Sequence, residues 1–152
     1  MEINNTKEIK DICQEIVDVY KNAVKDSGHS ASGELAKTAR YKIKWDGKWF
    51  ELSFVLQDYW KYIENGTRAH FPPSDAIEKW IRAKRIIPSS INGKVPTTKQ
   101  LAFLIARGIS KNGTPATKLL QKSMDSCDDL INKLVDAIIN QIEEQELEED
   151  IL

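Results

Sequence analysis

Apolar residues near the N-terminus recur at intervals of three and four positions, which is the spacing of one face of an α-helix. This pattern predicts an N-terminal helix that Asn5 or Thr6 caps and that ends at Gly28. The small polar residues of segment 27–33 predict a flexible loop after it. The residues expected on the buried face of the helix are Ile9, Ile12, Cys13, Ile16, Val17, Tyr20 and Val24.

Residues 40–56 follow a second pattern, in which apolar and polar side chains alternate. Alternation predicts a β-strand with one face exposed to water, and two such runs flank the pair Asp46-Gly47. Asp-Gly is favoured in two-residue type I′ turns. We therefore expect an antiparallel hairpin with a two-residue turn.

The apolar spacing returns to that of a helix over residues 74–85, with Ser74 as the expected cap. Residues 86–96 form a connector in which Asn92-Gly93 predicts a turn with short strand pairing around it. We expect Trp80 to anchor the helix to the core. The expected inner face of this helix consists of Ile77, Trp80 and Ile81.

A further helix is predicted over residues 98–111. Thr97 and Gln100 have the spacing of a capping box, in which each side chain bonds the backbone of the other residue. The residues expected on the inner face are Leu101, Ile105 and Ile109.

The last helix is predicted to be long, from residue 115 to 146, with Thr114 as cap and Pro115 at its first position. It would measure on the order of 45 Å at about 1.5 Å per residue, so its far end should project or pack on another chain. Acids at its C-terminus oppose the helix dipole and predict fraying. Its apolar seam consists of Leu120, Met124, Cys127, Ile131, Leu134, Ile138 and Ile142.

Together these elements predict the α+β class: an N-terminal helix, a small antiparallel sheet built on a hairpin, and several helices including a long C-terminal one. A length of 152 residues fits a single domain, which we place at residues 1–142, followed by an acidic tail at 143–152. Cys13 and Cys127 lie on apolar faces and predict buried free thiols. The charged N-terminus predicts no signal peptide, and no apolar run approaches the about 18 residues of a membrane span.

Charge is distributed unevenly along the chain, although the net charge is only −1. Residues 61–120 hold 11 basic and 3 acidic residues, whereas residues 121–152 hold 2 basic and 10 acidic ones. The basic third of one copy is therefore suited to attract the acidic end of another copy, or a polyanion.

The stretch from Tyr59 to Arg85 contains the most distinctive loop. Gly66-Thr67 and Pro72-Pro73 restrict the backbone at its two ends. Three of the four residues between them, Arg68, His70 and Phe71, are thereby presented in a defined place. A loop of this kind is suited to present a catalytic group, a nucleic-acid contact or a contact for another protein.

Catalysis receives little support from the residues. His29 and His70 are the only histidines, and no Cys–His, Ser–His–Asp or zinc-binding pattern accompanies them. A small hydrolase that uses His70 would need a second residue, which the sequence does not offer. We therefore expect no enzyme, no cofactor and no metal, and we interpret Asn65-Gly66-Thr67 and Asn112-Gly113-Thr114 as turns.

Two binding hypotheses remain. The basic region 79–111 with nearby Trp60, His70 and Phe71 is compatible with a small DNA-binding module. Segregated charge, an overlong helix and a rigid loop with arginine and aromatics favour protein assembly instead, through a head-to-tail contact that can close into a ring. The same features are also compatible with packing inside one monomer.

Two blocks of residues also carry a resemblance to a known family. The first block comprises Tyr62, Glu64, Gly66, Thr67, His70, Pro72, Pro73, Trp80 and Lys84. The second comprises Ile105, Ala106, Arg107, Gly113, Thr114 and Ala116. In these residues the chain resembles the small head–tail connector (neck, or tail-completion) proteins of tailed bacteriophages. The likeness covers roughly residues 57–124, although residues 118–121 lack the Phe-Leu-Arg-Pro-like start that the family often has in its last helix.

The resemblance implies a structural virion protein without catalysis or cofactor, made in the bacterial host cytoplasm. It would form a ring, commonly twelve-fold, between the portal and the tail or other neck proteins, with DNA passing through the opening and no membrane contact. The surface expected to dock on neighbouring chains comprises Glu64, Gly66, Thr67, Arg68, His70, Phe71, Arg82, Lys84 and Arg85.

Overall fold

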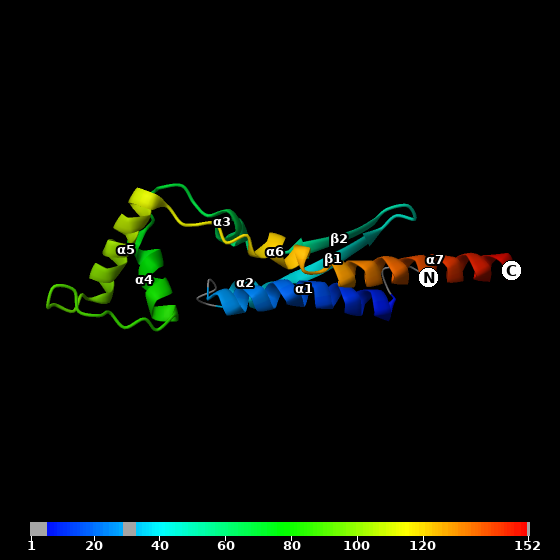
Figure 1. Ribbon diagram of the computed structural model, residues 1–152, viewed down its shortest axis with the longest axis horizontal. Helices are drawn as coiled ribbons and strands as arrows, with labels where there is room; N and C mark the ends of the chain where they lie inside the picture. The colour runs from blue at the N-terminus through cyan, green and yellow to red at the C-terminus, as the bar shows by residue number, and fades with distance from the viewer. Residues whose placement is uncertain (1–5, 29–32, 152) are drawn as a thin grey trace.

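The computed structural model describes residues 6–28 and 33–151, which form an elongated α+β molecule with two lobes (Figure 1). The larger lobe, here called the body, contains α1 (Lys7–Ser27), α2 (Glu34–Thr38), β1 (Arg40–Trp45), β2 (Phe50–Val55), α3 (Trp60–Asn65), α6 (Leu119–Asp125) and α7 (Asp128–Ile151). The smaller distal lobe consists of α4 (Ser74–Ala83) and α5 (Thr98–Asn112). Two segments, 66–73 and 113–118, connect the lobes and are here called the neck.

Helix α1 is the central element of the body and confirms the first prediction. All seven residues expected on its inner face are buried, and the helix packs against α7, α6, α2 and β1. Gly28 ends the helix in the left-handed conformation (φ 71°), as expected. Thr6 occupies the cap position, but its side chain makes no capping hydrogen bond; Asn5 and His29 lie outside the described residues.

The hairpin is confirmed, but its turn is not. Trp45 pairs with Phe50, so the connection contains the four residues 46–49 rather than two. The Asp46 carboxylate accepts hydrogen bonds from the backbone N–H groups of Lys48 (2.9 Å) and Trp49 (2.7 Å). These side-chain bonds close a wider loop, which explains why the two-residue prediction fails.

The predicted long helix starts later than expected and is broken once. Residues 113–118 lie in the neck and are not helical, so Thr114 and Pro115 do not start a helix, and α6 begins only at Leu119. A break then separates α6 from α7, where the Ser126 hydroxyl donates to the carbonyl oxygen of Ser123 (2.7 Å). Such back-bonding by a serine bends or ends helices.

The apolar seam itself is confirmed despite these differences. Cys127 and Leu134 are buried against α1. Leu120 packs beside Tyr20, farther along the body. The remaining seam residues, Met124, Ile131, Ile138 and Ile142, are partly buried against the same core as Cys127. Residues 143–151 continue α7 as a helix, so the acidic tail is helical as far as it is described.

In the distal lobe, α4 and α5 pack against each other through a small core of Ile77, Ile81, Ala102 and Ala106. The capping box of Thr97 and Gln100 is confirmed in both directions. The inner face of α5 is centred on the two alanines, while the predicted Leu101, Ile105 and Ile109 are only partly buried beside it.

Helix α4 departs from the prediction in two respects, its cap residue and the position of Trp80. Pro73 occupies the cap position in place of Ser74, which is the first helical residue. Trp80 is 37% exposed, and the prediction that it anchors the helix to the core is wrong. The connector does form the expected turn at Asn92-Gly93, where both residues have positive φ and Ile91 pairs with Lys94.

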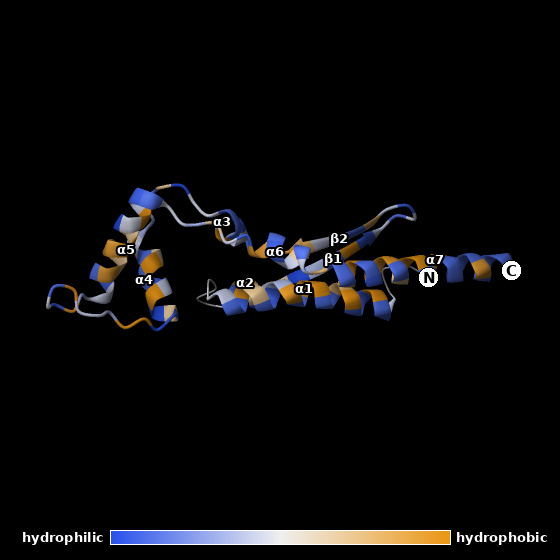
Figure 2. Cartoon of the chain, viewed as in Figure 1, coloured by the Kyte–Doolittle hydropathy of each residue, from blue (hydrophilic) through white to orange (hydrophobic). Residues whose placement is uncertain are grey.

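The distribution of hydropathy follows this architecture (Figure 2). Apolar residues of α1 face α7 and the hairpin, while the far end of α7 is mainly hydrophilic. Both cysteines are buried free thiols, as predicted, and burial raises the pKa of Cys13 to about 11. Among the described residues, no helix combines the length and apolar character needed to cross a bilayer.

Candidate functional site

The neck is held together by two copies of the same tripeptide. Thr67 and Thr114 pair antiparallel: each backbone N–H donates to the carbonyl oxygen of the other residue, at 3.1 and 3.2 Å. Their hydroxyl groups share a further hydrogen bond of 2.9 Å. Both threonines belong to an Asn-Gly-Thr sequence, 65–67 and 112–114. The interpretation of these sequences as turns is therefore wrong, because together they form the link between the lobes.

The glycines of these tripeptides allow the two segments to approach closely. Gly66 and Gly113 both have positive φ, 71° and 69°. A Cβ atom on Gly66 would overlap the Thr114 carbonyl oxygen, and one on Gly113 would overlap that of Thr67. Any other residue would force the neck segments apart.

Glu64 fixes the body side of the neck. Its side chain is buried, and its two carboxylate oxygens accept hydrogen bonds from the backbone N–H groups of Leu120 (2.7 Å) and Gln121 (3.1 Å). A carboxylate in this position satisfies free N–H groups at the start of α6 and complements the helix dipole. Beside it, the Thr117 hydroxyl donates to the Ile63 carbonyl oxygen (2.7 Å), which ties the second neck segment to α3.

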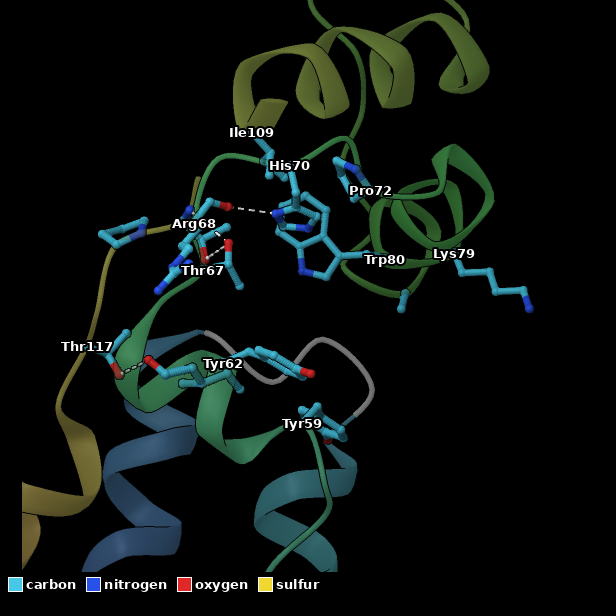
Figure 3. A pocket seen from close by; sticks show the side chains of 14 residues that line it. Tyr59, Tyr62, Thr67, Arg68, His70, Pro72, Lys79, Trp80, Ile109 and Thr117 are labelled. Atoms are coloured by element: carbon cyan, nitrogen blue, oxygen red, sulfur yellow. Dashed lines mark hydrogen bonds between the residues drawn. The ribbon is translucent and has the colours of Figure 1, made fainter. Parts of the chain in front are cut away.

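A groove of about 990 Å³ lies between the body and the distal lobe, with the neck as its back wall (Figure 3). Tyr59 and Tyr62 face it from the body, and Trp80 faces it from α4 on the opposite side. Tyr62 is 60% exposed, so most of its ring is accessible to a binding partner. The other lining residues are Ile63, Thr67, Arg68, His70, Pro72, Lys79, Ala83, Ile109, Thr114, Pro115 and Thr117.

Lys84 connects the distal lobe to the end of α1. Its ammonium group donates a hydrogen bond to the carbonyl oxygen of Gly28 and lies 5.1 Å from the centre of the Trp80 ring. The Lys84 cation lies over one face of the indole ring, where cation and ring attract each other. Trp80 is thereby oriented without being buried.

The groove is apolar in its walls and basic at its edge. Arg68 and Lys79 contribute positive charge, and no described residue that lines the groove is acidic. The Arg68 carbonyl oxygen accepts a hydrogen bond from His70 Nδ1 (2.8 Å), which fixes the imidazole at the groove. A groove with apolar walls and only basic charge at its edge is suited to bind an acidic amphipathic segment.

Three residues of the predicted docking surface line this groove: Thr67, Arg68 and His70. Phe71 turns away from it and packs on Phe103 of α5, with ring centres 6.0 Å apart, although it stays 56% exposed. The expected neighbours His70 and Phe71 therefore lie on different surfaces.

The other predicted residues have roles within the chain. Glu64 and Gly66 build the neck, as described above. Arg82 forms an ion pair with Glu78 one turn earlier on α4 (3.0 Å). Arg85 follows α4 with an exposed side chain and positive φ (55°). Whether these residues contact another chain stays a prediction.

Sequence reasoning missed the body side of the groove and the second neck segment. Tyr59 and Thr117 had no assigned role, Tyr62 was named only as part of the family resemblance, and Pro115 was placed in a helix. The repeated Asn-Gly-Thr sequence was the available signal, because a glycine in each copy allows two backbone segments to approach closely.

The described residues include no group of three or more His, Cys, Asp or Glu side chains that could hold a metal ion. The strongest pKa changes lie in the body core, where burial and then the nearby Glu64 charge raise the pKa of Tyr20 to about 12. Tyr20 is 1% exposed, so this shift reflects packing.

Comparisons with protein-family models, with curated proteins and with solved structures found no significant match to this chain.

Proposed function

We propose that the chain is a structural virion protein of a tailed bacteriophage. It forms part of the head–tail connector as a homo-oligomeric ring between the portal and the tail or other neck proteins. The proposal rests on the sequence resemblance and on one structural observation. Residues from both resembling blocks, Tyr62, His70, Trp80 and Thr114 among them, meet at a single groove.

The shape of the molecule supports assembly. The distal lobe touches the body mainly through the neck and Lys84, so most of its surface is free to contact a partner. Several large apolar side chains of this lobe, of the connector between its two helices and of the adjoining neck remain exposed, which is typical of surfaces that another protein covers. They are Phe71, Ile86, Ile87, Ile91, Val95, Phe103 and Leu104.

The mass of the purified chain, measured alone and with portal protein, tests the proposal. We expect a ring, or a complex with portal or tail protein, that Trp80→Ala weakens at least tenfold while the helix content stays unchanged. Trp49→Ala is the matched control, since Trp49 is 72% exposed at the hairpin tip, away from the groove. A strict monomer that binds neither portal nor tail protein would contradict the proposal.

A DNA-binding module is the second candidate, and the basic middle third of the chain favours it. Lys94 and Lys99 line a second hollow at the tip of the distal lobe together with Phe103. This candidate predicts retention on DNA that falls steeply with salt, and a shallower salt dependence when both lysines become alanine. Absence of retention at low salt would remove it.

A further inference from the structure

The end of α7 is an exposed amphipathic segment. Every described residue from Glu146 to Ile151 is exposed, and α7 continues past the N-terminal end of α1 (Figure 1). Leu147 and Ile151 are 63% and 84% exposed. They are four positions apart and therefore lie on the same face of the helix.

Acidic residues surround this apolar pair. Glu144 lies three positions before Leu147, and Glu148 lies three positions before Ile151, so both glutamates adjoin the apolar face. The last turn contains no basic residue, so these charges add to the negative end of the helix dipole. A helix end of this kind is stabilised by a partner that is apolar in its centre and basic at its edge.

The groove between the lobes has those two properties. Its walls are formed by Tyr62, Trp80 and Ile63, and its charged lining residues are Arg68 and Lys79. The α7 end projects from the opposite end of the body, far from the groove of its own chain (Figure 1). The segment that matches the groove must therefore come from a second copy.

We infer that the acidic end of α7 from one copy docks into the groove between the lobes of the next copy. Leu147 and Ile151 pack against Tyr62 and Trp80, while Glu144 and Glu148 approach the basic edge. This inference names the contact that builds the proposed ring, and so it rests on the proposed function. A contact between two different surfaces repeats head to tail and closes into a ring when the rotation allows.

Nucleic acid is the competing occupant, since bases stack on aromatic side chains in basic grooves. The lining favours the helix instead. Ile63, Ala83, Ile109 and Pro115 present apolar surface that a phosphate backbone would not use, whereas Leu147 and Ile151 would. The α7 end supplies the apolar and the acidic complement together.

Exchange of charge between the two surfaces tests the contact. In the groove variant, Arg68→Glu and Lys79→Glu make the edge of the groove acidic. In the tail variant, Glu144→Lys and Glu148→Lys make the docking face of the helix end basic. Each variant alone then opposes like charges at the contact, and each should self-associate at least tenfold more weakly than the wild type. An equimolar mixture should assemble again, because each groove meets a complementary helix end.

Analytical ultracentrifugation of the full chains at low and high salt gives the readout, with circular dichroism as the check on folding. The matched control is Lys94→Glu with Lys99→Glu, which changes the net charge by the same amount at the distal tip and should leave association unchanged. Restored assembly on mixing also shows that both variants are folded.

The contrary outcomes are distinct. Wild-type rings that persist in both variants alone would overturn the docking contact and leave the proposed function intact. So would a wild-type chain that is monomeric but joins the portal. Loss of DNA retention in the groove variant without loss of self-association would assign the groove to nucleic acid. A chain that neither self-associates nor binds portal would overturn both proposals.

Discussion

The body and the distal lobe differ in how much apolar surface each buries. The body has two clusters of buried apolar residues, one of seven and one of four, with Tyr20, Val24 and three isoleucines among them. The distal lobe buries only Ile77, Ile81 and two alanines. Small cores supply little stability, so we infer that the body folds by itself and that the distal lobe depends on the neck and on a partner.

Removal of one buried side chain from each lobe gives the largest expected difference. Ile16→Ala leaves a cavity in the body core and should lower the free energy of unfolding by about 2–5 kcal/mol. Ile81→Ala should instead open α4 and α5 locally, because the body core does not include it. Urea denaturation reports the first effect, and hydrogen exchange of α4 and α5 amides reports the second. Equal global destabilisation by both variants would show that the lobes unfold as one unit.

The neck is the next most sensitive place. Gly113→Ala brings a Cβ against the Thr67 carbonyl oxygen, in addition to the strain of positive φ, and should cost about 3 kcal/mol. Gly93→Ala is the matched control, because it has a similar φ with nothing nearby, and it should cost about 1 kcal/mol. Thermal unfolding of both variants checks the difference. Equal losses would mean that the neck segments do not approach as closely as described.

Loss of the Glu64 carboxylate should have a smaller effect. Glu64→Ala leaves the N–H groups of Leu120 and Gln121 without acceptors and should lower stability by about 1–2 kcal/mol. Glu64→Gln keeps one acceptor oxygen and should recover part of the loss. Chemical denaturation measures both variants. If Gln and Ala behave alike, the hydrogen bonds to α6 do not account for the effect.

The smallest effect at neutral pH concerns the buried thiol. The pKa of Cys13 is raised from 9.0 to about 11, so the folded chain keeps a proton that the unfolded chain releases. Stability is therefore unaffected below pH 9 and should fall by about 1.4 kcal/mol per pH unit between pH 9 and 11. Cys13→Ala should remove this part of the decline in denaturation curves recorded across that range. If the variant loses stability with pH just as the wild type does, another group causes the loss, and Tyr20, whose pKa is also raised, is the next candidate.

Patterns local in sequence predicted local structure well. The buried face of α1 and the capping box of α5 follow from spacing alone, because each depends on residues within one or two turns. Two of the four Asx-Gly pairs illustrate different outcomes. Asn92-Gly93 forms the tight turn, whereas the Asp46 side chain bonds nearby N–H groups and widens its loop.

Features that depend on distant residues were not predictable in the same way. Thr114 and Pro115 have the local signature of a helix start, but pairing with Thr67 keeps them extended. Trp80 has the spacing of a core residue, but α4 contributes only Ile77 and Ile81 to the core of the distal lobe. The groove exists only because the neck holds two lobes apart, and no single segment encodes that arrangement.

Hydrogen exchange of the wild-type chain across a range of protein concentrations tests the central claim most directly. The account predicts that two distant regions gain protection together as the chain self-associates: the last turns of α7 from Glu146 to Ile151, and the groove around Tyr62 and α4. The tip near Asn92 should not change. Self-association that leaves both the α7 end and the groove unprotected would contradict the account.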